Sequence, residues 1–220
     1  MDRLLFSGDF LNTALEEGSR AALLQRAARR VDFDPRPLPE ASLAALERAA
    51  LEGPSAVRMV RDGAERVAVA GLVAEGDRIL FADPAYRFEL MTCWRRRASE
   101  DETDADALLP LPDLFPGHGS FYLSSFDLGD LQARRDFRLA ARAPLHLVVH
   151  AGAGPQRPGA AVETSQRLLA QAETQRLEAS FFNQPVLVPD LARRLAWTLR
   201  LPGPPLVLLA VGVPRAGQPG

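Results

Sequence analysis

The apolar run at residues 204–213, PPLVLLAVGV, constrains the fold of this chain more than any other stretch. Successive side chains of a strand point to opposite faces of a sheet, so a strand with one solvated face alternates between apolar and polar residues. This run does not alternate, and it is bounded by prolines and too short to span a bilayer. It therefore predicts a strand that is covered on both faces.

The composition sets the broad class of protein. A chain of 220 residues with 47% hydrophobic content can bury a substantial core, so we predict a single domain over residues 1–220. The formal net charge is only -2, which gives no general attraction to nucleic acid or to a membrane surface. Cys93 is the only cysteine, which excludes an intrachain disulfide, and the first residues lack a signal-peptide core. We expect a soluble, cytoplasmic protein.

Several segments carry apolar residues at helical spacing. Residues 38–55 have Pro39 before the expected start and Gly53 beyond the expected end, where helix boundaries favour these residue types. Asp190 is in a position to cap the last of these segments, whose leucines fall on one face. This last segment spans residues 189–203, and two further helices are predicted at residues 82–97 and 159–179.

The rest of the chain predicts strands and loops. Residues 143–154, APLHLVVHAGAG, predict a strand that leads into a glycine-rich turn. An Asp62-Gly63 turn signal separates an alternating segment from the apolar residues 67–73, whose periodicity fits a helix or a strand. Residues 98–120 are first acidic and then rich in proline, which predicts a loop or lid. Helices and strands in this irregular order predict an α+β fold.

Three common kinds of site are not supported by the sequence. His146 and His150 lie in the predicted strand, where four residues separate them by roughly 13 Å, so one metal ion cannot bind both. Ser120, in GHGSF, lacks the glycine pattern of a nucleophile elbow. The glycines of residues 151–159 lack the G-x-G-x-x-G spacing of a dinucleotide site. We therefore predict no metal site.

Three segments, taken in order, resemble the nitroreductase superfamily. Residues 27–55 contain an Arg-Arg pair, a proline-rich stretch and a helix that ends in Pro-Ser; residues 74–97 contain Asp-Pro, Arg-Phe-Glu-Leu and Trp; and residues 159–214 contain a long helix, a turn ending in Gln-Pro, a further helix and an apolar strand. The pattern is most similar to the branch typified by the mycobacterial dormancy-linked Acg protein, in particular to the second half of its longer chains. The resemblance implies a nitroreductase-like mixed sheet flanked by helices.

The resemblance also implies a cofactor site. In such proteins FMN lies between two like halves, so it implies a homodimer of this chain. Arg29 and Arg30 would approach the ribityl phosphate, and Ser55 the edge of the ring system. The turn LEASFFNQPVLVP matches the place where backbone amides face flavin N5, and such donors stabilise the charge that arrives with a hydride. The residues implied at this turn are Phe182, Asn183 and Gln184.

The chain departs from the family pattern in two places. The motif P-S-x-x-N-x-Q-P-W continues at residues 54–60 only as PSAVRMV, and Ala210 occupies the position of an arginine in the last strand. Arg215 is a candidate to replace the missing positive charge. Losing a charge-assisted phosphate contact costs about 1.5–3 kcal/mol, which is one to two decades in affinity.

Two functions from different classes follow. The first is an FMN-dependent oxidoreductase that takes electrons from NAD(P)H and passes them to a small acceptor such as a nitroaromatic or a quinone, with no general acid required from a side chain. The second is a flavin-sequestering or degenerate protein that keeps the fold without turnover, which the altered motifs favour. The adjacent Phe181 and Phe182 also fit a simpler role in packing a core turn.

Overall fold

A computed structural model of the chain describes residues 30–88, 90, 127–152 and 159–215. Three predicted features lie outside these residues: Arg29, the loop at 98–120, and the arginines at 95–97 that end the predicted helix 82–97. The helices are α3 (Glu40–Leu51), α4 (Gly63–Ala82), α7 (Gly129–Arg142), α8 (Ala160–Thr174), α9 (Gln184–Leu187) and α10 (Pro189–Leu199). The strands are β1 (Ala56–Val60), β2 (Leu145–His150), β3 (Glu178–Phe181) and β4 (Pro205–Gly212).

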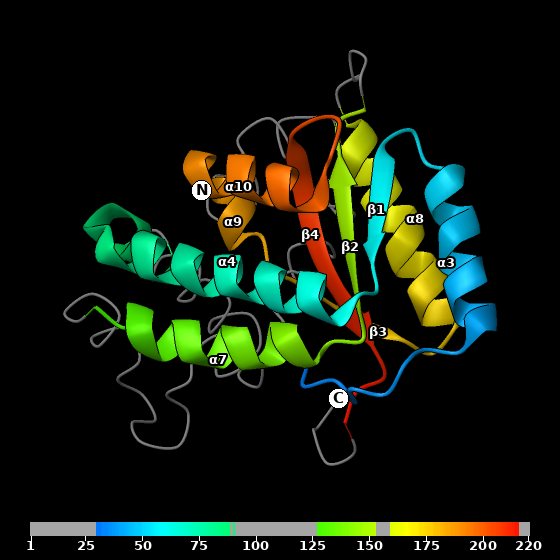
Figure 1. The fold of residues 1–220 in the computed structure, drawn as a ribbon, viewed down its shortest axis with the longest axis horizontal. Coiled ribbons are helices and arrows are strands. Elements are labelled where there is room, and N and C mark those ends of the chain that lie inside the picture. The colour runs from blue at the N-terminus through cyan, green and yellow to red at the C-terminus, as the bar shows by residue number, and fades with distance from the viewer. Residues whose placement is uncertain (1–29, 89, 91–126, 153–158, 216–220) are drawn as a thin grey trace.

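The strands form one sheet in the order β1-β2-β4-β3, and each described pair is antiparallel. The two central strands, β2 and β4, pair through Leu147 with Leu209 and Val148 with Leu208. Helices α3 and α8 cover one face of the sheet, while α4, α7, α9 and α10 cover the other (Figure 1). The predicted α+β arrangement, a sheet flanked by helices, is confirmed.

The predicted burial of the last strand on both faces is confirmed. Val207, Leu209 and Val211 belong to the apolar cluster beneath α3 and α8, whereas Leu208 and Ala210 belong to the cluster beneath α4 and α10. Burying a large aliphatic side chain stabilises a fold by roughly 1.5–3 kcal/mol, so filling both faces makes this strand central to stability. The alternation shows why the run carries no polar position.

Most of the predicted helices are confirmed where the chain is described. Helix α3 starts directly after Pro39 and ends two residues before Gly53, α8 lies within 159–179, and α10 buries its leucines. The ambiguous residues 67–73 belong to α4, a 20-residue helix. Helix α7 and strand β3 were not predicted. No helix in the described part of the chain combines the length and apolar character needed to cross a membrane.

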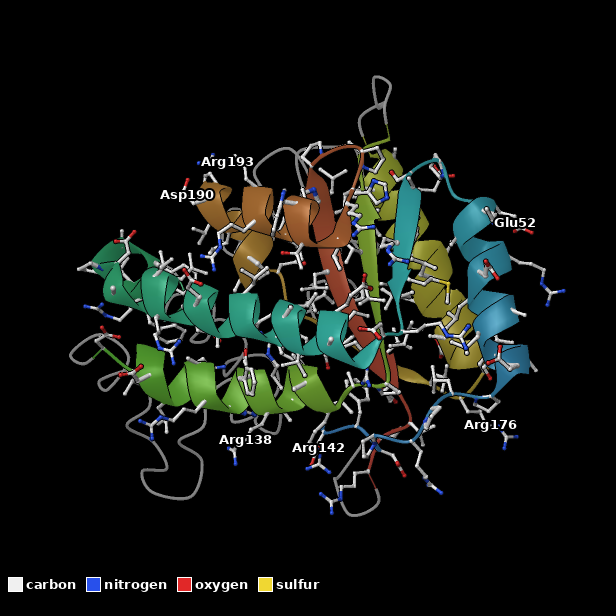
Figure 2. The ribbon with its side chains drawn as sticks, viewed as in Figure 1. Glu52, Arg138, Arg142, Arg176, Asp190 and Arg193 are labelled. Atoms are coloured by element: carbon white, nitrogen blue, oxygen red, sulfur yellow. The ribbon has the colours of Figure 1, made fainter. Side chains whose placement is uncertain are left out.

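Two aspartates have roles that differ from the sequence predictions. Asp62 caps α4, because its Oδ1 accepts hydrogen bonds from the amides of Ala64 and Glu65, each at 2.9 Å, so Asp62-Gly63 begins a helix and is not a hairpin turn. Asp190 is not a cap, since the N-cap of α10 is Val188. Its carboxylate instead pairs with Arg193 at the outer end of α10 (Figure 2).

Replacing each of these two aspartates with alanine compares the stability contribution of a helix cap with that of a surface ion pair. Asp62→Ala leaves two amides of the first turn of α4 without their acceptor, so we expect a loss of about 1 kcal/mol in the free energy of unfolding. Asp190→Ala removes only an exposed pair and is expected to change that free energy by less than about 0.5 kcal/mol. Urea titrations of both variants give the comparison, and equal losses would contradict the capping assignment.

His146 is a buried residue of β2, and both histidines of this strand make hydrogen bonds to backbone carbonyls. Its Nε2 donates to the carbonyl of Ala140 at 2.9 Å, while His150 Nδ1 lies 2.8 Å from the carbonyl of Ala151. Burial, helped by the nearby charge of Arg66 and opposed by the hydrogen bond to Ala140, lowers the pKa of His146 to about 4. The folded protein therefore holds this imidazole neutral.

The lowered pKa of His146 predicts a loss of stability in mild acid. Between pH 6.5 and about 4 the unfolded chain binds a proton that the folded chain excludes, so the free energy of unfolding falls as the pH falls. A shift of this size in the pKa corresponds to a loss of about 3 kcal/mol in the free energy of unfolding over the interval. Urea unfolding at both ends of the interval should show that, as the pH falls, the wild type loses about this much more stability than His146→Gln does. A variant that loses as much as the wild type would contradict burial as the cause.

Candidate functional site

The structure divides the predicted site residues among three places: Ser55 at one end of the sheet, Arg215 at the other end, and Arg30 with the turn at 182–184 inside the protein. Ser55 is buried directly before β1, and its amide donates to Thr164 Oγ1 of α8 at 3.0 Å. The turn around it lines a cleft of about 660 Å³ that extends along β1 to Met59 and reaches Gly152. A ligand edge can reach this turn through that cleft.

Arg215 follows β4 at the opposite end of the sheet, where segment 30–34 runs beside it. Its amide donates to the carbonyl of Asp32 at 2.9 Å, and its Nη1 lies 3.8 Å from Asp32 Oδ2. Arg142, at the end of α7, approaches the same carboxylate at 3.4 Å (Figure 2). The Arg215 side chain remains 59% exposed, so this end of the sheet presents two guanidinium groups around one aspartate.

These two places are too far apart to serve one ligand within a single chain. Ala56, next to Ser55, pairs with His150, and His150 pairs with Pro205 at the start of β4. Arg215 lies ten residues further along this extended segment, which spans roughly 30 Å at the usual rise of a strand. One flavin mononucleotide is shorter than this separation.

The turn at 182–184 is buried by contacts within the chain. The Phe182 amide donates to the carbonyl of Leu208 at 2.9 Å, and the amide of Leu208 donates to Asn183 Oδ1 at 2.8 Å. The Asn183 carbonyl accepts hydrogen bonds from the amides of Val186 and Leu187, which fixes the start of α9. The amide of Phe182 is therefore already used, and the Phe182 ring lies in the apolar cluster beneath α4 and α10.

Gln184 joins this turn to two helices. Its Nε2 donates to Asp77 Oδ1 of α4 at 3.0 Å and to Asp136 Oδ2 of α7 at 2.8 Å. Asp77 is 1% exposed and Asp136 is fully buried. Burial raises the pKa of Asp77 well above its ordinary value, and the charge of Asp136 raises it further, against the effects of Arg30, Gln184 and Arg78.

Arg30 completes this group, which we call the polar cluster: Arg30, Asp77, Asp136 and Gln184. Its Nε donates to Asp136 Oδ2 at 3.0 Å, its Nη1 donates to the Phe181 carbonyl at 2.8 Å, and its guanidinium lies 4.7 Å from the centre of the Phe182 ring. Burial opposes the charge on Arg30, but the charges of Asp136 and Asp77 outweigh it and raise the pKa of the guanidinium. The structure thus gives Arg30, only 13% exposed, internal partners, and its approach to a phosphate stays a prediction.

Sequence reasoning missed Asp77 and Asp136 for a physical reason. The buried face of α7 includes Gln132 and Asp136, so its inward positions do not follow an apolar pattern. Asp77 follows Gly76 in an otherwise apolar part of α4 and looks like a residue of the exposed face. A polar residue at a helical spacing from buried apolar positions is the signal that was available in both helices.

Arrangements typical of metal enzymes are absent from the described residues: no group of three His, Cys, Asp or Glu side chains there is placed to hold a metal ion. The polar cluster contains two carboxylates, and its guanidinium and carboxamide supply hydrogen-bond donors to them. This arrangement holds charge and positions a turn.

Comparisons with known proteins decide the fold. No protein-family model matches the chain, and no curated protein matches it in sequence. Iodotyrosine deiodinase bound to FMN and 3-iodo-L-tyrosine has a similar structure, with a TM-score of 0.54 and 16% identity over 90% of this chain and 91% of that chain. A nitroreductase with bound FMN from Bacteroides fragilis gives 0.51 and 14% over 94% and 92%. The chain has a nitroreductase fold.

An FMN-dependent nitroreductase from Mycobacterium smegmatis, solved in complex with NADPH, is similar at a TM-score of 0.50 and 16% identity, over 93% of this chain and 96% of that chain. The predicted nitroreductase-like fold is therefore confirmed. Within this nitroreductase fold, the polar cluster lies between the sheet and helices α4, α7 and α9, and it holds the turn that the sequence predicts to face flavin N5.

Gly76 allows the close approach of α4 to this turn. A Cβ at Gly76 would lie 2.7 Å from Gln184 Cβ and 3.0 Å from its backbone carbon, whereas a Cβ at Gly71 of the same helix would meet nothing within 4 Å. We expect Gly76→Ala to lower the free energy of unfolding by roughly 1–3 kcal/mol through overpacking. Gly71→Ala is the matched control and should raise it by up to about 1 kcal/mol, since alanine is the better helix former.

Chemical denaturation of the two glycine variants measures both changes. Hydrogen exchange of the amides at 184–187 adds a local readout, because only Gly76→Ala displaces α9. A Gly76→Ala variant as stable as Gly71→Ala would mean that the turn is not packed against α4 as described.

Proposed function

We propose that the protein is an FMN-binding member of the nitroreductase superfamily, with the whole chain forming one domain. The nitroreductase fold carries this proposal, together with the presence of FMN in two of the similar structures, each aligned over at least 90% of this chain. The order of the motifs in the sequence supports it independently. The closer likeness to the Acg-type branch, and to the second half of its chains, rests on that order of motifs alone.

The placement of the candidate residues supports a homodimer. Ser55 and Arg215 lie at opposite ends of the sheet, so a single subunit cannot bring both to one flavin. Two copies related by a two-fold axis can place the Ser55 turn of one subunit beside the arginines of the other, and each such dimer contains two equivalent sites. The proposal is therefore that each FMN lies between two subunits.

The residues present fit this cofactor in part. Arg215, an exposed guanidinium next to Arg142, has the chemistry to bind a phosphate, since the guanidinium fork matches phosphate oxygens. The cleft beside Ser55 offers room for a planar edge. The side chains of Asn183 and Gln184 are engaged within the chain, so a flavin contact at this turn depends on its backbone. Arg29 stays a candidate outside the described residues.

We further propose that the bound protein is an oxidoreductase. FMN would accept a hydride from NAD(P)H and return electrons to a small acceptor such as a nitroaromatic or a quinone. The chain would bind the phosphate through Arg215, exclude water with the apolar cluster behind Phe182, and orient the turn at 182–184 through the polar cluster. A cytoplasmic location is the expected setting for NAD(P)H.

A second function is favoured by specific observations. Ala210 stands where the family has an arginine, and its side chain lies in the buried cluster beneath α4 and α10, so it contributes no charge to a phosphate. The Phe182 amide is bound to Leu208 and is not available as a donor to N5. These features favour a protein that sequesters flavin, or that keeps the fold without turnover.

The absorbance spectrum of the purified protein tests the first step. We expect a yellow protein that releases FMN on denaturation, at two FMN per dimer, and a dimer in analytical ultracentrifugation. Oxidation of NADPH or NADH with menadione or a nitrofuran as the acceptor would then support the oxidoreductase. FMN binding without turnover would support sequestration, and a colourless protein that takes up no added FMN would overturn both.

Arg215 is the residue through which phosphate binding is tested. We expect Arg215→Ala to weaken FMN binding by roughly 10- to 100-fold, the range for a lost charge-assisted contact. Arg193→Ala is the control, because Arg193 is also an exposed arginine but lies on α10, away from the Arg142 end of the molecule (Figure 2). Fluorescence titration with FMN and with riboflavin distinguishes the phosphate contribution. Equal affinities in both variants would exclude Arg215 from the site.

A further inference from the structure

Some of the buried acceptor atoms of the polar cluster have no hydrogen-bond donor among the described residues. Both N–H groups of the Gln184 carboxamide are directed to carboxylates, one to Asp77 and one to Asp136. Asp77 Oδ2, Asp136 Oδ1 and Gln184 Oε1 are buried and have no hydrogen-bond partner in the described part of the chain. A buried acceptor without a donor is costly, so we expect the cluster to hold at least one further proton.

The charges in the cluster lead to the same conclusion. The two carboxylate oxygens that bind Gln184 Nε2 lie within about 6 Å of each other, since both are within hydrogen-bond distance of one nitrogen. Arg30 binds Asp136 directly and does not bind Asp77 among its described contacts. Two buried carboxylates this close favour a state in which one of them is protonated. Asp77, without a direct cationic partner in the cluster, is the one to carry the proton.

We infer that Asp77 is a neutral carboxylic acid that positions the turn at 182–184 through a reciprocal pair with the Gln184 carboxamide. Gln184 Nε2 donates to Asp77 Oδ1, as observed, and a proton on Asp77 Oδ2 donates to Gln184 Oε1. The second bond satisfies two of the three unpartnered acceptors with one hydrogen. Gly76 makes the approach possible, because no side chain there keeps the turn away from α4.

Each charged group near Asp77 has a defined place. Asp136 of α7 and Arg30 of segment 30–34 act on it from outside its own helix, with Gln184 of α9 as its hydrogen-bond partner. Arg78, its neighbour on α4, is paired with the exposed Asp130 of α7. Among the described residues, Arg135 of α7 also lies near Asp136 and Arg30.

The inference predicts a dependence on pH that is opposite in sign to that of His146. The raised pKa means that the folded chain holds a proton on Asp77 that the unfolded chain has lost. This contribution to stability is fully present below the unfolded pKa of about 3.9 and is lost as the pH rises through the folded pKa. Ionised Asp77 still accepts the hydrogen bond from Gln184 Nε2 but cannot donate to Gln184 Oε1, so the turn is held to α4 by one hydrogen bond instead of two.

Stability of the protein without flavin gives the first test. Asp77→Asn can form the same reciprocal pair at every pH, while Asp77→Ala cannot form it. Between about pH 4 and about pH 9 we expect the urea midpoint of the wild type to fall relative to that of Asp77→Asn. Hydrogen exchange at 182–187 should accelerate in Asp77→Ala and remain slow in Asp77→Asn. Asp83→Asn is the control, because Asp83 is an exposed aspartate at the end of the same helix.

Flavin binding gives the second test, and this part rests on the proposed function. We expect Asp77→Asn to bind FMN with the wild-type affinity and visible spectrum at neutral pH, and Asp77→Ala to bind roughly tenfold more weakly, the loss of about one hydrogen bond. The affinity of the wild type should fall with rising pH, while that of Asp77→Asn should not. Asp83→Asn should follow the wild type throughout.

The outcomes separate the two proposals. A wild type that binds no FMN but shows the pH-linked stability supports the Asp77 inference and overturns the proposed function. A wild type whose urea midpoint follows that of Asp77→Asn across the range overturns the inference, because Asp77 is then not the group that loses a proton. An Asp77→Asn variant with turn exchange as fast as in Asp77→Ala also overturns it.

Discussion

The burial of β2 and β4 on both faces is the constraint on which the rest of the structure depends. Neither strand offers a polar face to water, so helices must cover both sides of the sheet before the strands are stable. Antiparallel pairing aligns the apolar residues of the two strands in register. The need to cover both faces of β2 and β4 therefore fixes where the outer elements lie, including the turn at 182–184.

The two faces of the sheet are covered differently. The face beneath α3 and α8 is packed with apolar side chains, whereas the face beneath α4, α7 and α9 also holds the polar cluster. Burying charges costs free energy that packing alone does not recover, and such groups are retained only with close partners. In this protein the partners come from segments far apart in the sequence, so the cluster joins two helices to the turn that follows β3.

The candidate cofactor site, unlike the polar cluster, depends on residues that lie far apart in space within one chain. Its exposed residues lie at the two ends of the sheet, and its buried residues lie in the cluster between them. A ligand that contacts both ends needs a second copy of the chain, which makes assembly part of the site. The polar cluster requires no such partner, because each of its hydrogen bonds is made within one chain. Positioning of the turn and binding of a ligand are therefore separable properties.

The sequence by itself determined the elements whose pattern is local: the doubly covered β4, the apolar helices α3, α8 and α10, and, through the order of its motifs, the nitroreductase fold. It left residues 67–73 open, and it missed α7, because the inward face of that helix carries Gln132 and Asp136. Only the tertiary structure decided that Arg30 binds Asp136 and that Gln184 joins Asp77 to Asp136. These partners are 48 to 107 residues apart, and no local periodicity encodes a contact between side chains that only the packing of helices on a sheet brings together.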